Sequence, residues 1–328
     1  MTDFLTGIRP TNLLHIGNYF GSVKQLVDFQ VNYNGVVMIV DYHAMDTESD
    51  PALLRKNILA LAATYLAAGI NVEQNILFQQ SAVSEHTELA WIFSTLMRMS
   101  EIERMTQYKD KAIMQGENVP VALFTYPILM AADILLYDAR MVPVGYDQKQ
   151  HVELARTIAE RFNRIYGETF HVPEVKLKEV GAKILGLDDP TKKMSKSANS
   201  EKNYISLMDS SDVIHKKIMS AVTDDKGAIN YSDDQPGIKN LIDIYSLASD
   251  QTTEQILQAY QGKGYGDLKK DTAAALIGYL SPLQKRIGEY LADEAELIRV
   301  LDAGAARARE IAAAKMAIVR KKVGVSLK

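Results

Sequence analysis

The chain has 328 residues, 47% of them hydrophobic, and a net charge of −4, which is enough chain for one large or two medium domains. The absence of cysteine excludes disulfides, thiol catalysis and cysteine-ligated metal centres, and fits a reducing compartment. With no signal-peptide pattern and no apolar run of membrane-spanning length, we expect a cytoplasmic protein without membrane contact.

The first segment predicts a strand, a turn and the start of a helix. A short apolar stretch precedes residues 6–18, and apolar residues then recur at helical spacing. Gly17 has no side chain, so a ligand can approach the backbone, and a helix N-terminus at this point suits a nucleotide. His15 and Asn18, three residues apart, can share one helix face and donate to phosphate oxygens.

The rest of the first half alternates strands and helices. A strand at 36–40 precedes a helix that Asp50 and Pro51 begin and Gly69 ends. Further strands are expected at 76–78 and 142–144, and helices at 88–97, 100–108, 128–137 and 148–166. This alternation predicts an α/β fold with a Rossmann-type doubly wound parallel sheet, whose ligands bind beyond the C-terminal strand ends.

From about residue 212 onward the patterns are helical, at 212–221, 237–248, 253–260, 267–291 and 294–322. The change from alternating strands and helices to helices alone predicts a domain boundary. We expect a Rossmann-type domain at 1–190, a linker at 191–203, a helical domain at 204–291, and a C-terminal helix at 292–328 that can pack back on the first domain. The basic end of that helix, residues 320–322, either matches the helix dipole or contacts RNA.

A lysine loop lies between the two halves. It reads Lys193-Met194-Ser195-Lys196-Ser197, and Pro190 with the small polar residues around it predicts an exposed loop. Two ammonium groups and two hydroxyls suit a polyphosphate. An arbitrary pair of lysines at this spacing is more often merely solvated, but the five-residue string is far more specific.

The lysine loop matches the KMSKS signature of class I aminoacyl-tRNA synthetases, and His15-Ile16-Gly17-Asn18 resembles their HIGH motif. The whole chain resembles bacterial-type tryptophanyl-tRNA synthetases. Further matching stretches follow in family order at 7–10, 103–107, 130–134, 142–145, 147–151 and 263–266. The resemblance implies a homodimer in which the Rossmann domain at 1–190 is catalytic and the helical domain binds the anticodon. It also implies that L-tryptophan and ATP form tryptophanyl-adenylate and pyrophosphate, and that tryptophan is then transferred to tRNA(Trp).

The chemistry implied by the resemblance requires no general base, because the attacking tryptophan carboxylate is already an anion. The reaction then depends on positioning of the substrates and on neutralisation of the phosphate charge. The expected catalytic residues are Lys193, Lys196, Ser195, Lys111, Asn18 and His15. The resemblance places ATP at Arg9, Pro10, Thr11, Gly17, Asn18, Gly145, Tyr146, Asp147, Ile184, Lys193, Met194, Ser195, Lys196 and Ser197. Mg²⁺ is expected on the phosphates, without a dedicated protein site for a metal.

Asp133 is a carboxylate in an apolar stretch, and charged groups are rarely buried without partners. From the residues alone it is either a solvent-facing helix residue or a buried acceptor. The resemblance implies that it accepts the indole N–H, a group that can only donate. Tyr126, Met130, Gln148, Val142, Val144 and His43 are expected to line the same pocket. His86, His171 and His215 are interpreted as structural or solvated.

Two positions depart from the family pattern. Arg9 stands where the family commonly has an amide side chain, and Tyr146 replaces a commonly acidic residue. Two other functions remain open: a tyrosine-activating relative with the same fold, and a tRNA-binding paralogue that no longer catalyses. The intact lysine loop and Gly17 argue against the paralogue, and Asp133 in its apolar setting argues against tyrosine.

Overall fold

The computed structural model describes residues 2–11, 14–109, 119–177, 184–196 and 200–327. The described residues form a parallel five-stranded sheet in the order β3-β2-β1-β4-β5. The strand order reverses between β1 and β4, which opens a crevice at the C-terminal strand ends. The predicted doubly wound sheet is therefore confirmed. The strands are β1 (Phe4–Ile8), β2 (Gly35–Ile39), β3 (Ile76–Gln79), β4 (Met141–Val144) and β5 (Glu174–Leu177).

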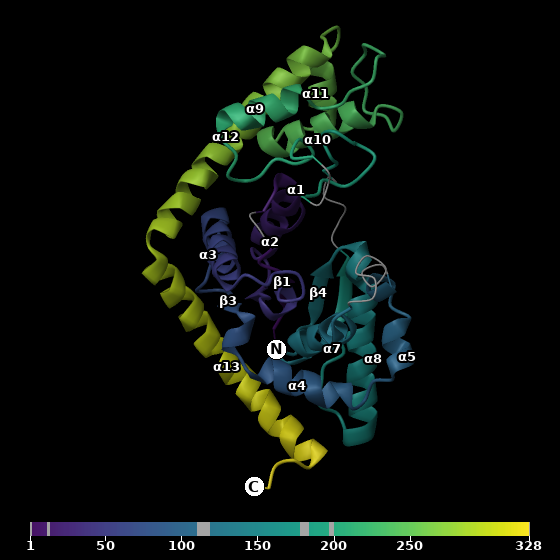
Figure 1. Cartoon of the computed structure of the whole chain (residues 1–328), viewed down its shortest axis with the longest axis vertical. Helices are drawn as coiled ribbons and strands as arrows, with labels where there is room; N and C mark the ends of the chain where they lie inside the picture. The colour runs from purple at the N-terminus through teal and green to yellow at the C-terminus, as the bar shows by residue number, and fades with distance from the viewer. Residues whose placement is uncertain (1, 12–13, 110–118, 178–183, 197–199, 328) are drawn as a thin grey trace.

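Helices cover both faces of this sheet (Figure 1). Neighbouring residues of β1 point to opposite faces, as the period of a strand requires: Phe4 belongs to one hydrophobic core and Leu5 to the other. The helices of this part are α1 (Ile16–Asn18), α2 (Lys24–Phe29), α3 (Pro51–Ala68), α4 (Glu85–Ser94), α5 (Met99–Glu103), α7 (Val121–Leu135) and α8 (Lys149–Tyr166). A π-helical turn (Tyr19–Val23) joins α1 to α2.

Helix α3 is the element that the sequence predicted most closely. Asp50 caps it by accepting from the backbone N–H of Ala52 at 2.9 Å, and Pro51 occupies the first turn. Gly69 ends the helix with φ 104°, a left-handed conformation that glycine adopts without strain. Both signals act within a few residues, so the sequence alone was enough to place the two ends.

Helix α7 was predicted to begin after Pro127, and that prediction is wrong. The helix begins at Val121 and contains Pro127 in its interior. An interior proline removes one hydrogen bond and costs about 3 kcal/mol. Leu123 and Ile128, on either side of it, are buried, so packing against the sheet outweighs the local preference. The sequence analysis also missed β5, a strand of four residues that includes the polar Glu174 and Lys176.

The second half is helical, as predicted. Its helices are α9 (Ser211–Met219), α10 (Pro236–Ser249), α11 (Thr253–Ala259), α12 (Tyr265–Ala292) and α13 (Glu294–Val323). Figure 1 shows α12 running from this group down to α3, and α13 continuing along the sheet past β3 and α4. No helix among the described residues is long and apolar enough to cross a membrane.

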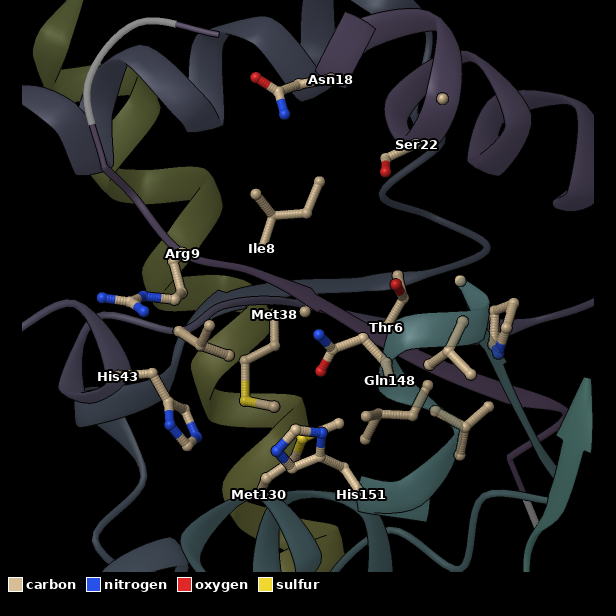
Figure 2. Close-up of a pocket in the computed structure, with 18 of the residues that line it drawn as sticks. Thr6, Ile8, Arg9, Asn18, Ser22, Met38, His43, Met130, Gln148 and His151 are labelled. Atoms are coloured by element: carbon tan, nitrogen blue, oxygen red, sulfur yellow. The ribbon is translucent and has the colours of Figure 1, made fainter. Parts of the chain in front are cut away.

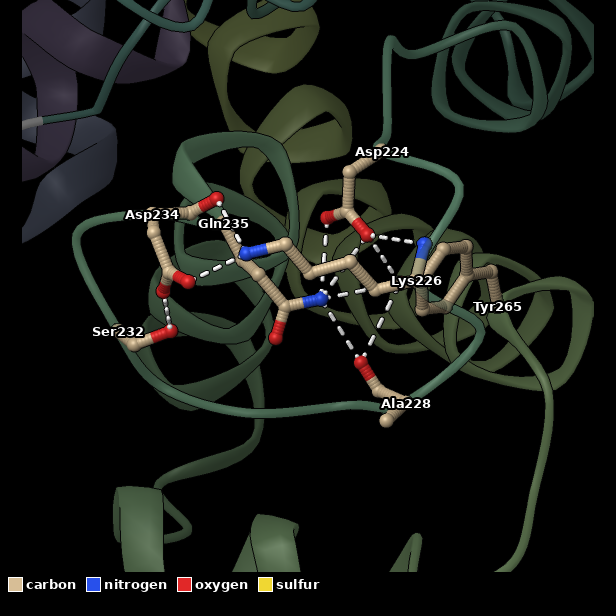
Figure 3. A network of polar contacts seen from close by, with 7 residues as sticks. All are labelled: Asp224, Lys226, Ala228, Ser232, Asp234, Gln235 and Tyr265. Atoms are coloured by element: carbon tan, nitrogen blue, oxygen red, sulfur yellow. Dashed lines mark hydrogen bonds and ion pairs between the residues drawn. The ribbon is translucent and has the colours of Figure 1, made fainter.

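A buried amide anchors the loop that precedes α10. The Gln235 side chain is 1% exposed, and its Nε2 donates to both carboxylate oxygens of Asp224 at 3.0 Å and to the Ala228 carbonyl at 2.8 Å (Figure 3). The Tyr265 hydroxyl at the start of α12 also contacts Gln235 Nε2, at 3.0 Å. These contacts fix residues 224–235 against the N-terminus of α12.

The basic end of α13 has an intramolecular partner. Arg320 donates through Nε and Nη2 to the two carboxylate oxygens of Glu88, at 2.7 and 2.5 Å. This bidentate pair joins the last turn of α13 to α4, and its fixed geometry makes it stronger than a single surface contact. Arg320 therefore stabilises the packing of the C-terminal helix.

Candidate active site

A cavity of about 1310 Å³ opens at the C-terminal ends of β1, β2 and β4. Figure 2 shows Asn18 and Ser22 at one end of it, and Met130, His43 and His151 at the other. The cavity thus has a polar end beside a helix N-terminus and a second end between the sheet and α7. Its lining includes most of the residues that the sequence analysis assigned to substrates: Arg9, Gly17, Asn18, His43, Tyr126, Met130, Asp133, Val142, Val144, Gly145, Tyr146, Gln148, Ile184 and Lys193.

Asp133 on α7 is held by three donors. His86 Nδ1 lies 2.7 Å from Oδ1, and His43 Nε2 lies 2.8 Å from Oδ2. Gln80 Nε2 lies 2.8 and 2.9 Å from the two oxygens. Asp133 itself is 3% exposed. It is therefore a buried carboxylate with partners, and the interpretation as a solvent-facing helix residue is wrong.

Asp133 is ionised in this environment. Burial by itself would raise the pKa of its carboxyl group, because it disfavours the charged form. The hydrogen bonds from His43 and His86 outweigh burial and hold the pKa well below its ordinary value. The cavity thus contains a carboxylate at its apolar end, which is an acceptor for an N–H group.

The walls around Asp133 are apolar with a few polar groups. Val142 and Val144 come from β4, and Met130 comes from α7, one turn before Asp133. The Tyr126 hydroxyl lies 2.9 Å from His151 Nε2, which links α7 to α8. Burial raises the pKa of Tyr126 to about 12, so the phenol remains protonated. An apolar slot with convergent polar groups is typical of a small-molecule site.

The polar end is built on the turn between β1 and α1. His15 is the N-cap: its Nδ1 accepts from the Asn18 backbone N–H at 3.3 Å, and Asn18 Oδ1 accepts from the His15 N–H at 3.4 Å. Burial, then the charges of Lys196 and Lys193, lower the pKa of His15 to about 4. His15 is therefore neutral near pH 7, and the proton of its ring is on Nε2.

The lysine loop lies against this turn. The Met194 backbone N–H donates to the Ile184 carbonyl at 3.1 Å. A Cβ placed on Gly17 would lie 2.9 Å from His15 Cε1, so the capping ring leaves no room for a side chain there, and 3.6 Å from Met194 Cβ, which places the loop in van der Waals contact with this position. Lys193 lines the cavity.

Lys196 points elsewhere in this structure. Its Nζ lies 5.7 Å from the centroid of the Tyr204 ring, and Lys217 Nζ lies 4.8 Å from the same centroid. Burial lowers the pKa of Lys196 to about 8; Asp209 opposes this effect and Lys217 adds to it. Lys196 is thus next to the helical half rather than in the cavity.

Several predicted site residues are not cavity-lining: Pro10, Thr11, His15, Met194, Ser195 and Lys196. Lys111 and Ser197 lie outside the described residues, and of Asp147 only the backbone is described, in the 3₁₀ turn Tyr146–Gln148. The sequence analysis missed Ser22 and Gln25 of the lining, although their spacing from Asn18 already placed them on one helix face. It also missed Asp46, the partner of Arg9, and Gln80 and His86, the partners of Asp133. His151, the partner of Tyr126, was missed as well. These partners are far apart in the sequence, so no local pattern connects them.

The described residues contain no group of three or more His, Cys, Asp or Glu side chains arranged to hold a metal ion. The polar end of the cavity presents amide, hydroxyl and ammonium groups, from Asn18, Gln25, Ser22 and Lys193. Such donors suit a phosphate chain whose charge is balanced by cations.

A doubly wound sheet with this cavity, a capped helix N-terminus and a lysine loop packed on it defines a class I aminoacyl-tRNA synthetase. The family model described as "tRNA synthetases class I (W and Y)" matches residues 1–281. A tryptophan–tRNA ligase of Clostridium tetani is 47% identical over 98% of this chain and 95% of its own length. The chain belongs to the tryptophan–tRNA ligase family.

Solved structures agree with this assignment. Tryptophanyl-tRNA synthetase from Mycoplasma pneumoniae superposes with a TM-score of 0.90 at 32% identity, covering 99% of each chain. The Campylobacter jejuni enzyme, solved with ADP and tryptophan, gives 0.86 at 38% identity, covering 98% of this chain and 99% of its own. The predicted activity, an ATP-dependent tryptophan–tRNA ligase, is confirmed over the tyrosine-activating and non-catalytic alternatives.

Proposed function

We propose that this chain activates L-tryptophan with Asp133 as the acceptor of the indole N–H. The observation that supports this most directly is the ionised, buried carboxylate at the apolar end of the cavity. Phenylalanine has no N–H to offer, so the carboxylate would lose a partner, at a cost of about 1–3 kcal/mol or more. Tyrosine carries its hydroxyl at the far end of the ring, away from the position of an indole N–H.

ATP then occupies the polar end, with its phosphates near Asn18 and Lys193. The tryptophan carboxylate attacks the α-phosphate and pyrophosphate leaves, so negative charge must be neutralised on the leaving group. Lys193 is already at the cavity, and Lys196 supplies a second ammonium group when the lysine loop moves toward it. Mg²⁺ would be coordinated mainly through the phosphates, since the residues at this end are amide, hydroxyl and ammonium groups.

The Asp133→Ala variant tests this assignment by amino-acid-dependent ATP–pyrophosphate exchange. We expect kcat/KM for tryptophan to fall at least about tenfold, equivalent to about 1.4 kcal/mol. The effect on phenylalanine should be much smaller or favourable. Asp302→Ala, at an exposed position on α13, is the control. Equal losses for both amino acids would show that Asp133 supports the fold or the nucleotide end instead.

We also propose that the protein is a cytoplasmic homodimer. Trp91 on α4 and Met99 on α5 are 74% and 68% exposed, and large apolar groups of this exposure suit a subunit interface. Light scattering at micromolar concentration measures the mass directly. A value near 36.5 kDa, the mass of one chain, would rule the dimer out.

The helical part from about residue 204 to 291 is proposed to bind the tRNA(Trp) anticodon. The chain is acidic overall, so RNA contact must depend on local basic groups such as the exposed Lys216 and Lys270. The logarithm of the affinity for tRNA should then fall linearly with the logarithm of salt concentration, because phosphate contacts release counterions. A flat salt response would contradict this proposal.

A further inference from the structure

His86 and Tyr137 form a buried chain of hydrogen bonds behind Asp133. His86 is 0% exposed and Tyr137 is 1% exposed. His86 Nδ1 lies 2.7 Å from Asp133 Oδ1, and His86 Nε2 lies 2.9 Å from the Tyr137 hydroxyl. Neither residue lines the cavity. Both ring nitrogens of His86 are therefore committed to partners within the protein.

These contacts determine which nitrogen carries the proton in neutral His86. The Asp133 carboxylate can only accept, so His86 Nδ1 must donate to it. His86 Nε2 is then an acceptor, and the Tyr137 hydroxyl donates to it. Burial raises the pKa of Tyr137, which keeps this hydroxyl protonated. Asp133 thus places the proton on Nδ1, the Tyr137 hydroxyl stabilises this tautomer by donating to Nε2, and the histidine directs a hydrogen at one oxygen of Asp133.

The donors of Asp133 differ in their access to substrate. An ionised carboxylate offers about four lone-pair sites, and among the described residues His43, His86 and Gln80 donate to it. Because Gln80 contacts both oxygens, these four contacts fill the sites, and a donor from the cavity must displace one of them. His43 lines the cavity and can move with substrate, whereas His86 is enclosed between Asp133, Tyr137 and the ring of Phe78, whose centroid lies 6.0 Å away. His86 is therefore the donor that stays fixed when a ligand enters.

We propose that His86, with its tautomer stabilised by Tyr137, is a positioning residue that orients the Asp133 carboxylate and thereby determines selectivity for an amino acid with an indole N–H. This inference rests on the proposed role of Asp133. Without the His86 donor the carboxylate rotates about its χ2 angle. It also takes up a proton more readily, because one fewer hydrogen bond then opposes the rise in its pKa that burial causes. The protonated or rotated group presents a poorer acceptor to the cavity.

Two substitutions of His86 distinguish the contact that Nδ1 makes with Asp133 from the contact that Nε2 makes with Tyr137. His86→Asn puts an amide nitrogen at the same number of bonds from the backbone as Nδ1, so it keeps the donor to Asp133. His86→Gln puts its amide nitrogen at the distance of Nε2, so it keeps contact with Tyr137 and loses the donor to Asp133. Tyr137→Phe leaves the His86 ring in place and removes the donor to Nε2 that stabilises this tautomer. His215→Gln, on an exposed face of α9, is the control.

The measurement is kcat/KM in ATP–pyrophosphate exchange for tryptophan and for β-(benzothiophen-3-yl)alanine, in which sulfur replaces the indole N–H. For the wild type we expect a tryptophan-to-analogue ratio of about ten or more. His86→Gln should lower this ratio at least about fivefold by reducing the tryptophan value alone. Tyr137→Phe should lower it about threefold, and His86→Asn and His215→Gln should leave it within about twofold of the wild type.

Three results would overturn the inference. Equal losses for both substrates in His86→Gln would mean that His86 only packs the core. An unchanged ratio in Tyr137→Phe would contradict a contribution of Tyr137 to the His86 tautomer, and this variant remains informative if His86→Gln does not fold. A wild-type ratio near one would remove Asp133 as the N–H acceptor. Only the last of these results, or the absence of any tryptophan-dependent exchange by the wild type, would also contradict the proposed function; the first two leave the role of Asp133 intact.

Discussion

Arg9 forms an ion pair through Nη2 with Asp46 at the wall of the cavity, and the same nitrogen donates to Thr47 Oγ1 at 2.7 Å. The Asp46 side chain is 8% exposed and that of Arg9 is 29% exposed. Both residues line the cavity, and in Figure 2 Arg9 lies between the end with Asn18 and the end with His43. The cation at position 9 is therefore accompanied by its own anion.

The first prediction concerns this pair. Arg9→Gln leaves a largely buried carboxylate without its partner next to a site that binds anions, so we expect KM for ATP to rise about tenfold. Arg9→Gln combined with Asp46→Asn should recover most of the loss, with a coupling energy of about 1 kcal/mol or more. Exchange kinetics for the two single variants and the double variant measure this coupling. Strictly additive effects would show that the two residues act independently.

The second prediction concerns the protonation of Lys196. Because burial lowers its pKa to about 8, the ammonium form needed to neutralise phosphate is lost as pH rises through that value. We expect kcat/KM for ATP, at saturating tryptophan, to fall above about pH 8. Lys196→Arg keeps its charge at these pH values, so its profile should stay flat there. An identical decline in wild type and variant would assign the titration to another group.

The third prediction is a pH dependence of stability caused by His15. Its pKa is about 4 in the folded chain against 6.5 for the ordinary side chain. Between these values the unfolded chain binds a proton that the folded chain does not, so stability falls as pH decreases from 6.5 to 4. The contribution is at most about 3 kcal/mol. Urea unfolding at several pH values measures the slope.

His15→Asn is the matched variant for this experiment, because asparagine is also a good N-cap and does not titrate. It should flatten the stability profile between pH 6.5 and 4 while keeping α1 capped. If the variant retains the slope of the wild type, the pH dependence comes from other groups. If it unfolds at all pH values, capping by the imidazole itself is what stabilises the turn.

The fourth prediction tests the packing of α13 on β3. A Cβ on Gly304 would lie 1.8 Å from the Leu77 carbonyl oxygen, so Gly304→Ala must push the helix off the strand. We expect a loss of about 2 kcal/mol or more of unfolding free energy. Gly278→Ala, in the exposed part of α12 with no atom within 4 Å of the added Cβ, should instead stabilise by about 0.5–1 kcal/mol. Similar effects at both positions, measured by urea unfolding, would contradict close packing at Gly304.

The sequence by itself determined features whose physical cause is local. The ends of α3 follow from Asp50 and Gly69, which act on neighbouring backbone groups. The helices of the second half follow from their apolar period. The turn at His15–Asn18 and the lysine loop are recognisable because a helix N-terminus and a string of ammonium groups bind phosphate in any fold that exposes them.

The tertiary structure decided which of these residues meet. Three residues converge on Asp133 from 47 to 90 residues away in the chain: His43 and Gln80, in the 3₁₀ turns after β2 and β3, and His86, in α4. No local pattern encodes this, so His86 was interpreted as structural or solvated although it is a direct partner of the central carboxylate. Parallel strands bring their C-terminal ends to one edge, but the packing of α4 and α7 on the sheet fixes which side chains face each other there. That packing is a sum of many weak contacts across the whole core, which a single sequence does not reveal.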